Sequence, residues 1–365
     1  MTDQATPTQA QSSYPCESCG ARVEFAPGTN VLRCPYCGHQ QQIALAQRQV
    51  QEHHIEELAH LPRKPVGMIA PHQYVCQKCG ARTASASLSE ACQFCSAPLV
   101  ADPRATGQVV PEAVLPFALD NRAAREALKK WISSRWFAPT SLKKVTDAES
   151  TKGTYLPYWT YDSHTASRYT GARGQHYYTT ESYTDSNGNT QTRQVQHTAW
   201  YPAAGEVRRF FDDVLVPATP RLGAKQLDEL APWPLQQAVP YQPAFLAGYH
   251  TLRYEMEPEQ GLNVAKGKMA EVIRGDVRRD IGGDVQRIDH IDTQYFQLMY
   301  KLMLLPVWLA NYLHGAKTYQ VMINARSGEV IGQRPYSAAK IAAAVTAGVL
   351  LLAAIITLIV IAQSH

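Results

Sequence analysis

The chain has 365 residues, which is enough for two or three domains, and a formal net charge of only +4. Such a small charge does not point to a polyanionic partner. The sequence contains no P-loop, GxGxxG, HExxH or GxSxG motif, so we expect no enzyme and assign no catalytic residue.

The first 13 residues, MTDQATPTQAQSS, are polar and contain no apolar core. A secretory signal needs an apolar stretch of 7 or more residues, so we predict a disordered tail instead.

Eight cysteines follow in four CxxC pairs, within residues 14–42 and 74–100. Fourteen residues separate the first two pairs and twelve separate the second two, a spacing typical of four-cysteine zinc ribbons. We therefore predict two zinc ribbons and two structural Zn²⁺ ions, because four thiolates leave no open coordination position. The predicted ligands are Cys16, Cys19, Cys34, Cys37, Cys76, Cys79, Cys92 and Cys95.

The two ribbons repeat each other, as YPCESCGARVEF against YVCQKCGARTAS shows. A glycine follows three of the four pairs, where we expect a left-handed backbone, and Ser96 replaces it in the last. Basic and acidic residues balance in the first ribbon and differ by one in the second. Nucleic-acid-binding modules carry a basic stripe, so protein contact is the favoured use and nucleic acid the alternative.

Residues 43–73 connect the ribbons, and we predict a helix over residues 43–61. His53, Glu57 and His60 would share one face of that helix. A metal site there is an alternative, but a solvated face is favoured because no further ligand is evident.

Residues 101–256 predict a β-rich domain that also contains a helix over residues 121–136, with Asp120 as its N-cap. From Thr154 onward, polar residues alternate with Tyr, Trp and Val, which is typical of strands. The pair Asn187-Gly188 predicts a hairpin between two such strands. The aromatic residues fit cross-strand packing better than a sugar or nucleotide platform.

Residues 257–340 predict a helix packed on an antiparallel sheet. Met269, Ile273, Val277 and Ile281 would face one way, and Gly282-Gly283 would end the helix. The run LMLLPVWLA predicts a buried strand because it is too short to cross a bilayer. The segment NARSG, residues 324–328, predicts a tight turn. The whole chain is thus expected to be α+β.

Residues 341–362 form an uncharged apolar run, which predicts one C-terminal transmembrane helix. Lys340, Arg334 and Arg326 precede it and no Lys or Arg follows it. The positive-inside rule therefore places residues 1–340 in the cytoplasm.

Several segments occur in a fixed order before the terminal span. They are the CxxC pairs, VLPFALDNRAAREALKKW, GTYLPYWTYD, PYQPAFLAGY, LLPVWLANY and INARSGEVIGQRPYS. From residue 14 to 362 the chain resembles a bacterial family of membrane-anchored zinc-ribbon proteins. Its members are often labelled primosomal protein N-prime (replication factor Y) or helicase-like zinc-ribbon proteins, and some are encoded beside phage-shock-protein-A-type and SPFH-type proteins. The resemblance implies a recruitment platform at the bacterial inner membrane with the same eight cysteine ligands. Without a P-loop, no motor function follows.

Three functions are consistent with these features. The favoured one is a membrane-tethered adaptor that recruits protein partners, in membrane stress for example. The alternative is a membrane-associated nucleic-acid-binding protein of the replication or primosome type, without its own motor. An enzyme based on the Tyr-rich β-domain would need a pocket with convergent polar groups.

Overall fold

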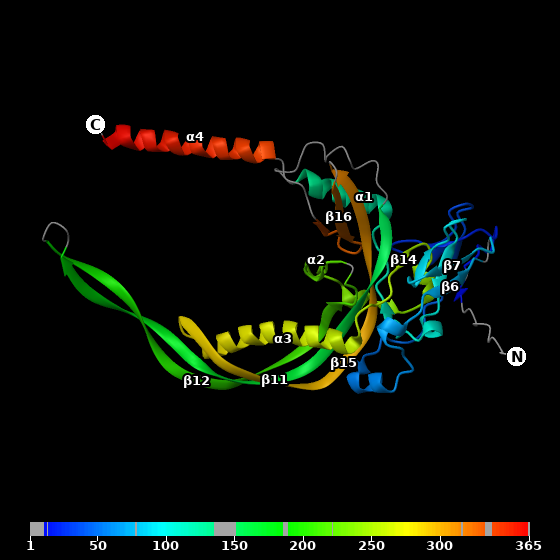
Figure 1. Ribbon diagram of the computed structural model, residues 1–365, viewed down its shortest axis with the longest axis horizontal. Coiled ribbons are helices and arrows are strands. Elements are labelled where there is room, and N and C mark those ends of the chain that lie inside the picture. The colour runs from blue at the N-terminus through cyan, green and yellow to red at the C-terminus, as the bar shows by residue number, and fades with distance from the viewer. Residues whose placement is uncertain are drawn as a thin grey trace.

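The computed structural model describes residues 11–12, 14–76, 79–134, 151–184, 189–220, 222–314, 317–332 and 338–363. They form an α+β protein with a β-rich body, as the sequence predicts (Figure 1). One twelve-stranded sheet runs through the body, and a three-stranded and a two-stranded sheet belong to the cysteine-containing segments.

The described residues form four α-helices and several short 3-10 helices. The α-helices are α1 (Asn121–Ser133), α2 (Ala224–Glu229), α3 (Pro258–Ile281) and α4 (Ala338–Gln363). The 3-10 helices are η1 (Ile55–Ala59), η2 (Val66–Met68), η3 (Pro103–Thr106), η5 (Leu235–Gln237) and η6 (Pro243–Leu246). Asp120 caps α1 as predicted, because its carboxylate accepts a hydrogen bond from the Ala123 N–H.

The strands range from two-residue pairs to very long ribbons. The short strands are β1 (Gln11–Ser12), β2 (Glu24–Phe25), β3 (Val31–Arg33), β4 (Gln40–Gln42), β5 (His53–His54), β6 (His72–Val75), β7 (Arg82–Ser85), β8 (Ser89–Ala91), β9 (Pro98–Ala101), β10 (Ala113–Val114), β13 (Val239–Pro240), β14 (His250–Thr251), β16 (Lys317–Asn324) and β17 (Val330–Gly332). The long strands are β11 (Lys152–Thr184), β12 (Thr190–Pro217) and β15 (Val285–His314).

The three long strands form a bent arm that extends from the body (Figure 1). β11 lies in the middle, antiparallel to β12 on one side and to β15 on the other. The ladder between β11 and β12 runs to Thr184 and Thr190, so the predicted hairpin is present. Its turn residues, Asn187 and Gly188, lie outside the described residues.

The arm bends where all three strands are irregular at the same level. The register of β11 shifts at Asp162 against both of its neighbours. Asp213 on β12 and Gln297 on β15 have φ angles of +52° and +50°, a conformation that side chains other than glycine rarely adopt. Such bulges bend a strand and increase its twist.

Helix α3 packs along the concave side of this bend (Figure 1). Met269, Ile273, Val277 and Ile281 are all buried, so the predicted apolar stripe is confirmed. They contact aromatic side chains of the sheet, including Trp159. Gly282 ends the helix with a φ of +65°, again as predicted.

The predicted helix over residues 43–61 is wrong. Residues 43–52 are irregular, β5 pairs with Met299 and Tyr300 of β15, and only η1 follows. The stretch contributes few buried apolar side chains, Leu58 among them. A helix here would therefore bury little apolar surface, and pairing with the sheet is the more stable arrangement. The connection over residues 43–73 is therefore a mostly irregular segment that is attached to the body through β5.

The predicted boundary at residues 256 and 257 does not divide the sheet. β11 from residues 101–256 and β15 from residues 257–340 pair from Lys152↔Leu309 to Gly174↔Val285. The run LMLLPVWLA is a buried strand in β15, and a turn joins β16 to β17, both as predicted. Helix α1 ends at Ser133, and the predicted residues 135–136 lie outside the described chain. The predicted disordered tail is wrong at Gln11 and Ser12, which form β1 because their backbone pairs with β9, and residues 1–10 and 13 lie outside the described residues.

Candidate metal centres

The first four cysteines converge on one point. The Sγ atoms of Cys16 and Cys37 lie 3.5 Å apart, and those of Cys19 and Cys34 lie 3.7 Å apart. All four sulfurs lie within 4.8 Å of one another. Around a tetrahedral ion with Zn–S bonds of about 2.3 Å, sulfurs would be about 3.8 Å apart, so the arrangement fits such an ion.

The second four cysteines form an equivalent cluster. The Sγ distances are 3.4 Å between Cys76 and Cys95 and 3.8 Å between Cys79 and Cys92. All eight cysteines are free thiols, and these distances are far longer than the S–S bond of about 2.05 Å. The predicted grouping of the cysteines into two sets of four is therefore confirmed.

The backbone around each CxxC pair repeats one hairpin geometry. After the first pair, the Gly20 N–H donates to the carbonyl of Cys16, and the Cys16 N–H donates to the carbonyl of Ala21. The same two bonds recur at the other three pairs. The residue that follows each pair has a positive φ, which is +70° at Gly80 and +56° at Ser96. Ser96 thus adopts the conformation that glycine takes elsewhere.

Without a cation, four thiolates cannot be charged together at this spacing. Hydrogen bonds from the backbone N–H groups of Cys37 and Tyr36 lower the pKa of Cys34 to about 7, against the opposing effect of burial. The pKa of Cys95 rises to about 12, because burial and the neighbouring sulfurs outweigh a backbone bond from Ala97. A divalent cation would lower the pKa of all four thiols in each cluster by favouring every thiolate.

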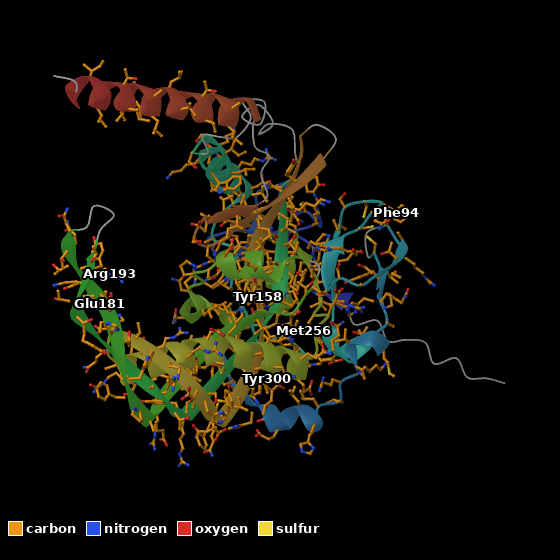
Figure 2. The ribbon with its side chains drawn as sticks, turned by 60° about the vertical axis from the view of Figure 1, so that its left-hand side comes forward. Phe94, Tyr158, Glu181, Arg193, Met256 and Tyr300 are labelled. Carbon is orange, nitrogen blue, oxygen red and sulfur yellow. The ribbon has the colours of Figure 1, made fainter. Side chains whose placement is uncertain are left out.

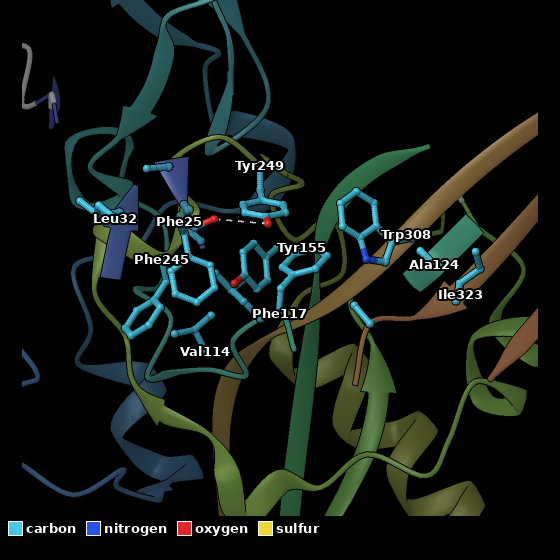
Figure 3. Close-up of a cluster of buried hydrophobic side chains, with 14 of the residues drawn as sticks. Phe25, Leu32, Val114, Phe117, Ala124, Tyr155, Phe245, Tyr249, Trp308 and Ile323 are labelled. Atoms are coloured by element: carbon cyan, nitrogen blue, oxygen red, sulfur yellow. Dashed lines mark hydrogen bonds between the residues drawn. The ribbon is translucent and has the colours of Figure 1, made fainter. Parts of the chain in front are cut away.

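The N-terminal module (residues 14–42) packs directly on the body (Figure 3). The Phe25 ring meets Phe245 edge-on at 5.2 Å, and the Phe25 N–H donates to the carbonyl of Ala247. Behind them, Phe117 stacks on Tyr249 at 4.1 Å. Cys16 and Cys34 belong to the same apolar cluster, which means that this metal centre shares its core with the body.

The second module (residues 74–100) has a small core of its own around Tyr74 and Leu99. It joins the large sheet where Ser89 of β8 pairs with Thr251 of β14. A hydrogen bond from the Arg22 guanidinium to the carbonyl of Ser96 connects the two modules.

Each module also exposes one large aromatic side chain beside its sulfurs. Tyr36 is 67% exposed and Phe94 is 73% exposed. Each lies just before the last cysteine of its module, in CPYC and CQFC. Figure 2 shows Phe94 at the outer side of the second module.

A third cluster of metal-binding residue types is occupied by a lysine. Oxygens of Glu52, Asp162 and Asp213 lie within 4.8 Å of one another. The ammonium group of Lys301 donates to both Glu52 and Asp213, and the Asp213 N–H donates to Asp162. Lys301 therefore takes the place of a cation here. The sequence signal for this cluster is Lys301 itself, a charged residue directly before the apolar run LMLLPVWLA of β15.

The histidines at 53 and 60 do not form a metal site in the described part of the chain. His53 lies 3.5 Å from the carboxylates of Glu57 and Glu112. These residues line a groove of about 800 Å³ between the connection and the body, together with Tyr241 and Tyr300. The groove has mixed polar and apolar walls, and no Ser, Thr, Cys or Lys is among the described residues that line it.

Helix α4 is the one described helix that is long and apolar enough to cross a membrane. Its stretch Lys340–Thr357 has a mean hydropathy of 2.1, and none of it is buried. Thr346 and Thr357 donate their hydroxyls to backbone carbonyls one turn earlier, so neither needs water.

No family model matches this chain, and no solved structure matches it. A relative from Bacillus subtilis (strain 168), the uncharacterized protein YdjG, is 25% identical over 337 residues. The match covers 91% of this chain and 92% of YdjG, so the similarity extends over almost the full length of both.

Proposed function

We propose that the chain is a membrane-tethered adaptor whose two zinc-binding modules recruit protein partners on the cytoplasmic side. The observation that carries this proposal is the pairing of each closed four-sulfur cluster with an exposed aromatic residue, Tyr36 or Phe94. Exposed aromatic side chains on rigid supports are the usual anchors of protein interfaces.

Zinc is the proposed ion in both modules. Four thiolates at tetrahedral spacing favour zinc or iron, and the spacing of the CxxC pairs supports a structural zinc site. With no open position, the ions would stabilise the modules and would not activate water. A non-enzymatic role accordingly remains our prediction.

The proposed location is the bacterial inner membrane, with α4 as a single span. Lys340 and Arg326 lie on the N-terminal side of the span, which favours a cytoplasmic body. The family resemblance adds phage-shock-protein-A-type and SPFH-type proteins as proposed partners.

Crosslinking in native membranes followed by mass spectrometry tests the adaptor proposal. Partners that bind through Tyr36 and Phe94 should be captured by the wild type and lost in a Tyr36→Ser/Phe94→Ser double variant. Phe210→Ser is the matched control, because Phe210 is 53% exposed on the arm and far from the modules in sequence. If the double variant captures the same proteins as the wild type, the proposal fails.

One observation favours nucleic-acid binding as a second candidate. Along the arm, arginines lie over exposed rings, with Arg173 5.9 Å from Tyr201 and Arg287 5.6 Å from Trp200. Aromatic and basic side chains together are typical of single-strand binding surfaces. Binding of single-stranded DNA to the purified chain should then weaken steeply with salt. A flat salt response removes this candidate.

A further inference from the structure

The outer half of the arm has a free strand edge. β15 begins at Val285, opposite Gly174, and covers β11 only up to that point. Just beyond it, the His176 N–H donates to the Asp284 carboxylate, so the uncovered edge of β11 runs from Tyr177 to Thr184, where β11 pairs with β12 on one side only. A two-stranded ribbon is only marginally stable in water, so a third strand at this edge would stabilise it.

This edge lacks the features that protect the other edges of the arm. Residues 177–184 read YYTTESYT, with one carboxylate, Glu181, and no proline, lysine or arginine. β12 contains Pro202 and six charged residues, and the outer edge of β15 contains Arg287, Asp289 and Asp292. Charges and prolines on an edge prevent pairing with other strands, whereas Thr and Tyr favour it.

We propose that this edge of β11 pairs antiparallel with the same edge of a second copy of the chain, with Thr180 on the two-fold axis. In that register Tyr177 faces Tyr183 across the interface, and Glu181 faces Thr179. Aromatic pairs stabilise a sheet and like charges opposite each other destabilise it. A register centred on Glu181 would place two carboxylates together, and one centred on Thr179 would lose the aromatic pair.

A second copy fits this edge better than an unrelated strand for two reasons. The β11 of the second copy would occupy the position beside β11 that β15 occupies up to Gly174. The free edges of the two copies have the same length, so each would cover the other. The arm also extends well away from the body, so the bodies would lie at opposite ends of the paired arms (Figure 1). An isologous contact of this kind closes as a dimer.

Disulfide trapping in the full-length chain tests the register. Opposite residues in an antiparallel pair have Cα atoms about 4.5–5.5 Å apart, which suits a disulfide. Thr180→Cys, oxidised mildly in the presence of zinc, should form a covalent dimer well above the wild-type background. The matched control is Gln194→Cys, because Gln194 lies opposite Thr180 on β12, away from the proposed interface. It should stay at the background level.

A charge at the axis provides the second measurement. Thr180→Lys would place two ammonium groups opposite each other, so the mass in detergent, corrected for bound detergent, should fall from dimer to monomer. Gln194→Lys should remain a dimer. A monomeric wild type, no excess crosslinking of Thr180→Cys, or equal crosslinking of Gln194→Cys would each overturn the proposal. None of these outcomes depends on whether the modules recruit proteins.

Discussion

The ammonium group of Lys301 is hydrogen-bonded to the carboxylate of Glu52, 249 positions away in the chain. Glu52 belongs to the connection between the cysteine modules, and Lys301 lies in the middle of β15. Lys301 also donates to Asp213 beside the bend of the arm. One buried charge thus joins the connection, the sheet and the bend.

Replacing Lys301 by methionine should destabilise the fold. Burial acts to lower the pKa of Lys301, but its bonds to Asp213 and Glu52 outweigh burial and raise it. Removing the ammonium leaves these carboxylates without a counter-ion, which costs about 3 kcal/mol in the free energy of unfolding. Chemical denaturation in detergent measures the loss. Lys129→Met, at an exposed position of α1, is the control, and an equal effect of both variants would contradict the role of the cluster.

The pH dependence of stability should contain a contribution from Asp162. Burial raises its pKa from 3.8 to about 7. The folded chain therefore holds this proton over a pH range in which the unfolded chain has lost it. Stability from this group falls as pH rises from about 4 to about 7, by up to about 1.4 kcal/mol per pH unit. Asp162→Asn should remove that decline while retaining the acceptor for the Asp213 N–H. Parallel pH profiles of the wild type and the variant would refute this.

Glycine at position 96 should stabilise the second module. Ser96 has a φ of +56°, where a side chain costs up to about 1 kcal/mol relative to glycine. Ser96→Gly should therefore slow the release of metal to a chelator. Gly80→Ala is the reverse experiment at the equivalent turn, where an added Cβ would meet nothing within 4 Å. It should speed release through backbone strain alone. Unchanged rates in both variants would show that the turns do not limit stability.

A methyl group at position 153 should disturb the core beneath the N-terminal module. A Cβ on Gly153 would lie 2.4 Å from the Tyr249 ring, which stacks on Phe117. Gly153→Ala should cost about 1–3 kcal/mol through overpacking. Gly267→Ala lies in α3 with open space around it and should stabilise by about 0.5–1 kcal/mol. Thermal unfolding of the two variants should shift in opposite directions.

Features with a local signal could be predicted from the sequence. CxxC spacing defines which sulfurs meet, and the stripe from Met269 to Ile281 defines the buried face of α3. The structure of the connection (residues 43–73) could not be predicted. Its composition is compatible with a helix, but β5 pairs with β15 instead. Likewise, no local pattern shows that the Phe25 ring packs on Phe245, or that Lys301 finds Glu52. Those contacts depend on segments about 200 or more residues apart.

Metal analysis of the purified full-length chain tests the central proposal most directly. Two zinc ions per chain are expected, falling to one in either Cys34→Ser or Cys92→Ser. A chain that is folded yet contains far less than two zinc ions, or contains iron in their place, would contradict the account.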